Sequence, residues 1–250
     1  MSNYRGSFGG GGAQLALPPV TPMLRLILMT LAGAFVVQTM LQLLGLPALI
    51  WWLALSGEGL RHFALWQLLT YGLLHGSIVT PQMGNLWHLA MNCLGLWVFG
   101  GDVERVLGSK GFLRFFIICV LGGGLLYGVA GFISGSPIPV IGASGGVLGV
   151  VLAFAIFFPK RQLILFPIPV PIRAWALAAI YLVLNVYGAL ANPDGGVAYL
   201  AHLGGMGAAF LYLRLMRGGG GAGRGWRSLF RKRPRFEVHR GDRRDPWDLH

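Results

Sequence analysis

Charged residues are scarce in this chain. Asp, Glu, Lys and Arg make up 11% of its 250 residues, whereas a soluble domain contains about 25%. Hydrophobic residues make up 55%, and the mean hydropathy is +0.65. A large soluble core does not account for this composition, which predicts a membrane protein.

Acidic residues and cysteines are scarcest of all. The eight Asp and Glu residues all lie outside the apolar stretches, which argues against a transporter or channel with paired intramembrane acids. Cys93 and Cys119 both lie in apolar segments, so we expect core-filling thiols and no disulfide. No Cys/His pair has the spacing of a zinc site, and we expect no metal and no cofactor.

Long apolar runs are abundant by contrast. Six of them cover residues 23–55, 86–99, 112–132, 140–158, 172–190 and 198–215. A helix needs about 20 residues to cross the hydrocarbon layer, and fewer where protein buries it. We therefore expect an all-α membrane protein with six transmembrane helices over residues 23–215, preceded by a disordered, Gly-rich N-terminus, residues 1–22.

Basic residues alternate between the connecting loops. The loops after the second and fourth runs hold Arg105, Lys110, Arg114, Lys160, Arg161 and Arg173. The loop after the first run holds Arg61 alone, and those after the third and fifth hold none. Positive charge marks the cytoplasmic side, so both termini are expected in the cytoplasm. The compact form favours a multi-pass protein of a bacterial inner membrane.

The external loop between the first two helices is long and unusually apolar. It covers residues 56–85 and includes "HFALWQLLTYGLLHG". We expect it to lie partly in the membrane interface, with Trp66 and Tyr71 as amphipathic anchors.

Few polar side chains interrupt the helices, and most share one depth. Counting 1.5 Å per residue from the external ends places His88, Asn92, Ser144 and His202 about 5–11 Å below the outer surface. Asn185 is placed deeper, as an interhelical hydrogen-bonding residue. Since polar groups in hydrocarbon are costly, four of them at one level predict a single site.

Small residues would let the helices that carry these groups approach closely. Gly145 and Gly149 follow the serine, and Gly205 and Ala209 follow His202, at a spacing typical of tight membrane-helix packing. The serine and histidine would then form a catalytic dyad, with His88 and Asn92 as oxyanion donors. Individually, a serine that bonds its own helix or a structural histidine remains an alternative.

The motifs resemble those of the rhomboid family of intramembrane serine proteases. "HLAMN" (88–92), "GASG" (142–145) and "AHLGG" (201–205) occur in the family's order and helices. The resemblance implies a six-helix bundle that cleaves single-pass membrane proteins, with Ser144 as nucleophile, His202 as general base, and His88 and Asn92 at the oxyanion. Gly142 belongs to the nucleophile motif, and a structural role is implied for Glu104.

The chain departs from the family's pattern beside the nucleophile. Leu148 stands where family members often place an aromatic against the histidine ring, and Ala209 where they often have glycine. A catalytically inactive, client-binding relative is the alternative function, although both the serine and the histidine are present.

Eleven of the 20 Lys and Arg residues lie between Arg214 and Arg244. Residues 216–250 are therefore expected to form a basic cytoplasmic tail. It either attracts anionic lipids or only enforces orientation. No nucleic-acid partner is expected, because no binding fold accompanies the charge.

Overall fold

The computed structural model describes residues 18, 20–76, 83–165, 168–191 and 199–218. Contacts divide the chain into residues 1–214 and 215–250, and the fold below is that of the first unit. Its elements are α1 (Pro22–Leu43), α2 (Pro47–Leu53), α3 (Gly57–Arg61), α4 (Gln67–Thr70), the 3-10 turn η1 (Tyr71–Leu73), α5 (Met83–Leu107), α6 (Ser109–Ser134), α7 (Ser144–Phe157), β1 (Gln162–Leu165), β2 (Ile168–Arg173), α8 (Ala174–Ala191) and α9 (Tyr199–Gly218).

The protein is mostly helical, as expected. Among the described residues, α1, α6 and α8 are long and apolar enough to cross a membrane, and α7 is a shorter apolar helix. The full set of six spans stays a prediction. The expected disorder of residues 1–22 falls mainly on residues outside the described ones, and so does nearly all of the basic tail, of which only 216–218 are described, within α9.

The first apolar run is two helices and not one. The chain breaks at Gly45, whose φ is +72°, and Pro47 starts α2 at a position where its missing N–H costs nothing. Leucines continue on both sides of the break, so hydropathy alone does not reveal it.

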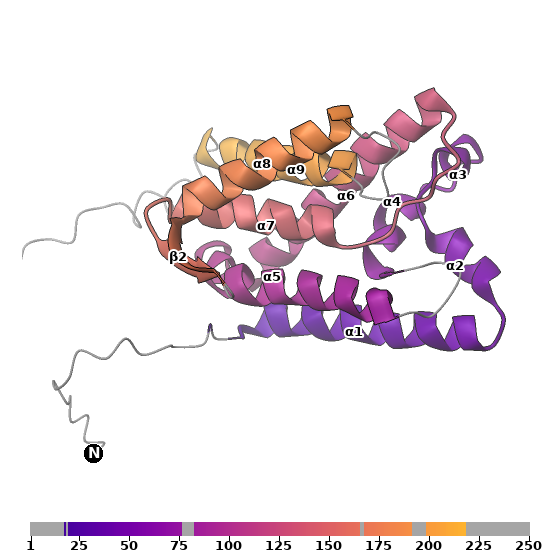
Figure 1. Cartoon of the computed structure of the whole chain (residues 1–250), viewed down its shortest axis with the longest axis horizontal. Coiled ribbons are helices and arrows are strands. Elements are labelled where there is room, and N and C mark those ends of the chain that lie inside the picture. The colour runs from indigo at the N-terminus through magenta and orange to yellow at the C-terminus, as the bar shows by residue number, and fades with distance from the viewer. Residues whose placement is uncertain (1–17, 19, 77–82, 166–167, 192–198, 219–250) are drawn as a thin grey trace, which may run out of the picture. The chain divides into compact units, whose positions relative to one another are not determined.

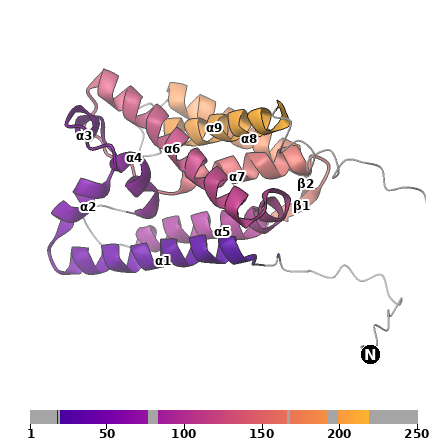
Figure 2. The ribbon, with the colours of Figure 1, turned by 180° about the vertical axis from the view of Figure 1, so that it is seen from behind.

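Helix α7 is the buried centre of the fold. It contacts α5, α6 and α8, and Figures 1 and 2 show it between α5 on one side and α8 and α9 on the other. Most of its side chains are buried, as expected of a helix that is apolar on every face. Its glycines allow the close approach: a Cβ at Gly146 would lie 2.7 Å from a ring carbon of Phe116 in α6.

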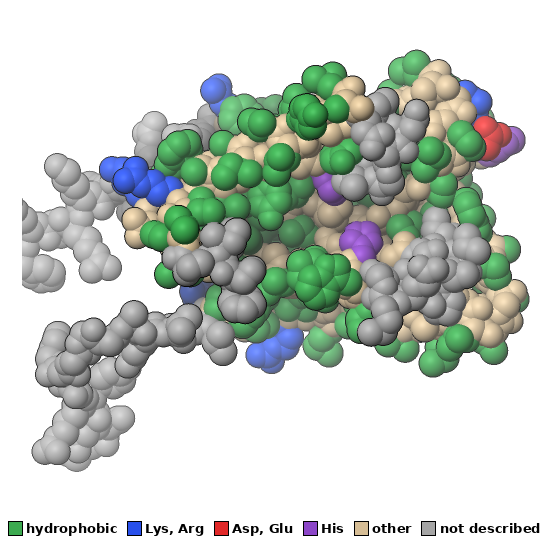
Figure 3. All heavy atoms as spheres, in the orientation of Figure 1, with side chains coloured by type: hydrophobic (Ala, Val, Ile, Leu, Met, Phe, Trp, Pro, Cys, Tyr) green, Lys and Arg blue, Asp and Glu red, His purple; other side chains and the backbone are tan. Residues whose placement is uncertain are grey.

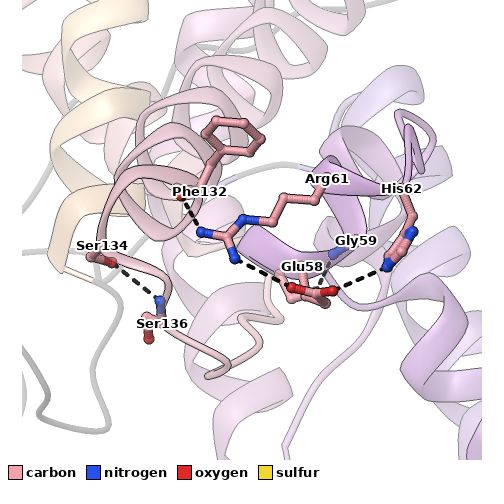
Figure 4. Close-up of polar contacts among 8 residues, drawn as sticks. Glu58, Gly59, Arg61, His62, Phe132, Ser134 and Ser136 are labelled. Atoms are coloured by element: carbon pink, nitrogen blue, oxygen red, sulfur yellow. Dashed lines mark hydrogen bonds and ion pairs between the residues drawn. The ribbon is translucent and has the colours of Figure 1, made fainter.

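The described part of the loop after α1 is docked firmly on α6. Gly57 and Gly131 approach so closely that a Cβ on Gly57 would overlap the α6 backbone. Arg61 donates from Nη2 to the carbonyl oxygen of Phe132 at 2.8 Å, and Glu58 pairs with both Arg61 and His62 (Figure 4). We call the end of the bundle formed by α2, α3 and α4 the loop end.

One expected membrane anchor lies in the core instead. Tyr71 is 1% exposed, and its hydroxyl donates to the carbonyl oxygen of Val120 in α6 at 2.7 Å. The anchor role predicted for Tyr71 is therefore wrong. Trp66 is 41% exposed, which is compatible with its expected role. A buried tyrosine needs a partner for its hydroxyl, and Val120 supplies it.

The opposite end of the bundle carries a short β-hairpin, which the all-α expectation omitted. Strands β1 and β2 pair antiparallel, with Gln162 opposite Arg173. Arg161, just before β1, forms an ion pair with Asp102 of α5 at 2.5 Å. We call this end, with β1, β2 and Asp102, the hairpin end.

Glu104 joins three helices near the hairpin end. Its carboxylate accepts hydrogen bonds from the hydroxyls of Thr21 and Ser109 and from the backbone N–H groups of Met23 and Leu24. The first turn of a helix has N–H groups without partners, and Glu104 satisfies two of them in α1. The structural role expected for Glu104 is present.

Candidate active site

Ser144 is the first residue of α7, and the residues before it are held from two sides. The backbone of Val140 pairs with Leu55, and the N–H of Gly142 donates to the carbonyl oxygen of Tyr71 at 2.9 Å. Gly142 has a φ of +123°, a backbone conformation that residues with a Cβ rarely adopt. This turn sets the serine at a helix N-terminus, where backbone N–H groups point outward.

His202 of α9 reaches Ser144 directly. The distance from His202 Nε2 to Ser144 Oγ is 2.7 Å, within the range of a strong hydrogen bond. The approach depends on the small residues between α7 and α9, because a Cβ on Gly145 would lie 2.8 Å from the carbonyl oxygen of Ala201. The predicted contact between the serine and the histidine is present.

Gly149 and Gly205, two other predicted small residues, lie along the same seam. A Cβ on Gly149 would lie 2.6 Å from Cys119 Sγ and 3.2 Å from the carbonyl oxygen of Gly205. Ala209 is fully buried. Cys93 and Cys119 are free thiols, as expected, and Cys119 serves as packing for α7.

Asn185 of α8 contacts the other nitrogen of His202. The distance from His202 Nδ1 to Asn185 Oδ1 is 2.7 Å, and Asn185 Nδ2 donates to the carbonyl oxygen of Tyr181 at 2.8 Å. The expected interhelical hydrogen bond therefore exists, but the depth assigned to Asn185 was wrong. It lies six residues before the end of α8, at the level of the serine.

His88 and Asn92 lie one turn apart on α5 at the same cavity. Asn92 Nδ2 donates to the carbonyl oxygen of His88 at 2.8 Å, and the backbone N–H of Gly76 donates to His88 Nδ1 at 3.1 Å. A Cβ on Gly142 would lie 2.9 Å from His88 Nε2. This nitrogen therefore faces the turn that precedes the serine.

Two positioning residues were not predicted from the sequence. His75 is fully buried and packs edge-on against His88, with ring centroids 5.2 Å apart. Gln38 of α1 holds the backbone of His75 with both amide atoms, at 2.8 and 2.9 Å. A glutamine in an apolar stretch is a costly group, so Gln38 could have been found by the same rule that found the other polar residues.

One cavity of about 840 Å³ is lined by Ser144, His202, Asn185, His88 and Asn92, together with apolar residues that include Trp51, Met91 and Leu148. In Figure 3, histidine side chains lie in a recess among hydrophobic ones. The size is in the range of ligand-binding cavities. Among the described residues, no group of three or more His, Cys, Asp or Glu side chains could hold a metal ion.

Comparison with known proteins agrees with the motifs. A family model for the rhomboid domain matches residues 62–218, which is more than half of the chain.

The chain belongs to the rhomboid family.

Its rhomboid relatives include bacterial and mitochondrial proteins. It is 33% identical over 184 residues to Rhomboid protein 1, mitochondrial, of Saccharomyces cerevisiae. The match covers 64% of this chain and 51% of that protein. It is 26% identical to Rhomboid protease GlpG of Serratia proteamaculans, over 71% of this chain and 59% of that protein. A shorter match, 40% identical, relates 34% of this chain to 14% of Rhomboid protease GluP of Bacillus subtilis.

Membership in the rhomboid family, together with apolar helices of spanning length, makes this an integral membrane protein. The chain matches about half the length of the first of these relatives. Because that rhomboid protein is mitochondrial, the bacterial inner membrane stays a prediction, as does the cytoplasmic place of both termini.

Proposed function

We propose that this rhomboid is an intramembrane serine endopeptidase that hydrolyses peptide bonds in or near the transmembrane segments of single-pass proteins. The observation that carries the proposal is the 2.7 Å contact between Ser144 Oγ and His202 Nε2 in a cavity among apolar helices. Residues 23–215 form the six-span protease domain, and residues 216–250 form a basic tail on the cytoplasmic side.

The first chemical step is attack by the serine. His202 Nε2 removes the hydroxyl proton of Ser144 as its oxygen bonds to the substrate carbonyl carbon. The imidazolium then gives this proton to the leaving amine, and the acyl group stays on the serine as an ester. A water molecule, deprotonated by His202, hydrolyses the ester and restores the hydroxyl.

Three donors converge on the oxyanion that forms in each step. His88 Nδ1 accepts from the Gly76 N–H, so the proton of the neutral ring is on Nε2, which faces the Gly142 turn. The Asn92 amide uses one proton on its own helix and has a second to donate. The backbone N–H of Ser144, at the start of α7, is the third donor.

The arrangement resolves the difficulty of a hydrolytic serine in an apolar helix. Ser144 lines the cavity, and polar groups are tolerated inside a membrane bundle where they line such a space. The proposed orientation, with both termini in the cytoplasm, is supported by the positions of the basic residues. Most of the described Lys and Arg side chains that are visible in Figure 3 lie toward the hairpin end. The loop end, nearer the serine, would then be external.

A substrate helix must unwind locally before its carbonyl reaches Ser144, because helical peptide groups are bonded to one another. We therefore propose that substrates carry helix-weakening Gly or Pro residues or small residues near the cut. Equal cleavage of a substrate with an uninterrupted polyleucine helix would contradict this.

Reconstitution in lipid vesicles with a labelled transmembrane substrate tests the function. Wild-type protein should cleave it, and Ser144→Ala and His202→Ala should each abolish cleavage. Matched controls are Ser134→Ala and His62→Ala, which replace exposed residues at the loop end and should cleave normally. Specific binding of the substrate without cleavage would instead support the inactive, client-binding alternative.

A further inference from the structure

We propose that Asn185 is a positioning residue that keeps the proton of neutral His202 on Nδ1 and so leaves Nε2 free to accept the proton of Ser144. This inference rests on the proposed function, since it names the group that prepares the general base. Neither the serine nor the substrate contacts Asn185 in this role; it acts through the imidazole ring.

The orientation of the Asn185 amide is determined by its own helix. Its nitrogen lies 2.8 Å from the carbonyl oxygen of Tyr181, and a carbonyl oxygen can only accept a hydrogen bond. Rotating the amide by 180° would place two oxygens against each other and remove this bond. Asn185 is 6% exposed, so an unpaired amide would also be costly.

With the amide fixed, Oδ1 is the atom that faces His202. An amide oxygen only accepts, so the nitrogen 2.7 Å away, Nδ1, must be the donor. A neutral imidazole carries one proton, and its other nitrogen then presents a lone pair. That nitrogen is Nε2, which lies 2.7 Å from Ser144 Oγ. The hydrogen bonds therefore run in one direction, from the serine to the histidine, to the asparagine and to Tyr181.

The two histidines of the cavity are prepared in opposite ways. Nδ1 of His88 accepts from a backbone N–H, which puts the proton on its Nε2. Nδ1 of His202 donates to Asn185, which removes the proton from its Nε2. The partner on the far nitrogen decides the role of each ring, and the result is one donor and one acceptor, as acyl transfer requires.

An amide oxygen suits this position better than a carboxylate would in a membrane. The Asn185 dipole stabilises the imidazolium as it forms, yet it adds no net charge to the resting site. Leu148, which replaces the aromatic expected against the ring, lines the cavity but has no group to bond the imidazole. The orientation of His202 thus depends on Asn185.

The test combines kinetics with a direct measurement of the tautomer. Full-length protein labelled with ¹⁵N-histidine should show a protonated Nδ1 and an unprotonated Nε2 for the resonances that disappear in His202→Ala. In Asn185→Ala the two tautomers should mix, and kcat should fall about 10²-fold with KM nearly unchanged. Val183→Ala, an exposed change on the same helix, should leave both unaffected.

Asn185→Asp supplies the conservative replacement. Its carboxylate still accepts from Nδ1, so activity should recover at high pH. The low-pH limb of kcat/KM should move upward, because a negative charge stabilises the imidazolium. A structural role alone would not move this limb.

Two results would overturn the inference: Nε2 protonated in the wild type, or Asn185→Ala with an unchanged kcat and pH profile. If the wild type cleaves no substrate, or Ser144→Ala cleaves normally, the proposed function fails instead. The tautomer measurement decides the role of Asn185 in either case.

Discussion

Replacing Gly205 by alanine should separate α7 from α9 and break the hydrogen bond between Ser144 and His202. A Cβ on residue 205 would lie 2.5 Å from the carbonyl carbon of Gly145 and 2.8 Å from its Cα. Ordinary contacts between carbon atoms are about 3.5–4.0 Å. Since both contacts are with backbone, no side chain can rotate away, and the helices must move apart by about 1 Å.

The same displacement acts on the site, because Ser144 precedes Gly145 and His202 lies one helical turn before Gly205. Adding about 1 Å to the 2.7 Å between Oγ and Nε2 takes the pair beyond hydrogen-bonding distance. We expect kcat/KM to fall about 10²-fold and the free energy of unfolding to fall by about 1–3 kcal/mol.

Gly207→Ala is the matched control on the same helix. Apart from its chain neighbours and the backbone of its own helix, no atom lies within 4 Å of a Cβ at this position. Alanine also favours a helix over glycine by about 1 kcal/mol. This variant should cleave as the wild type does and melt at the same or a higher temperature. Gly205→Ala with wild-type cleavage and thermal stability would refute the claim that this backbone contact positions the site.

Two further changes test other parts of the structure. Gly142→Ala places a Cβ 2.8 Å from His88 Cε1 at a φ of +123°, so kcat should fall more than tenfold. The control is Gly108→Ala, where φ is +71° and the space around the Cβ is open. It should lower the free energy of unfolding by about 1 kcal/mol and leave kcat unchanged. Burial opposes ionisation of Glu104, but its hydrogen bonds with Ser109, Thr21 and two backbone N–H groups outweigh this and hold its pKa below the usual range. The stabilisation is complete at neutral pH and is lost as the pH falls below about 4.3 toward the lowered pKa, so wild-type melting temperature in detergent should drop there. Glu104→Gln should melt lower at pH 7 and lose this drop; a parallel pH dependence in both proteins would contradict the assignment.

Hydropathy predicted α6 and α8 with errors of a few residues, whereas α5 ends at Leu107, eight residues beyond its predicted run. The run 112–132 became α6, Ser109–Ser134, and the run 172–190 became α8, Ala174–Ala191. It failed where the local backbone changes direction within apolar sequence. The break at Gly45 lies among hydrophobic residues and does not alter the hydropathy. The hairpin of β1 and β2 lies mostly in the loop after the fourth apolar run, where hydropathy predicts no strand.

The site was predicted where a polar residue stands alone in a helix and its depth can be counted. Ser144, His202, His88 and Asn92 were found this way, and they line one cavity. Asn185 was counted to the wrong depth, and Gln38 was passed over. Their partners are His202 and the backbone of His75, which are distant in sequence, so only the packing of helices reveals them.

The opposed tautomers of His88 and His202 have an electrical consequence. The described lining of the cavity contains no Asp, Glu, Lys or Arg, and both imidazoles are neutral in the arrangement proposed above. An acid and a base can thus be carried into a low-dielectric layer without the Born energy of an isolated ion. The rate of turnover should respond little to ionic strength or transmembrane voltage, because the resting site contains no fixed charge on which salt or voltage could act.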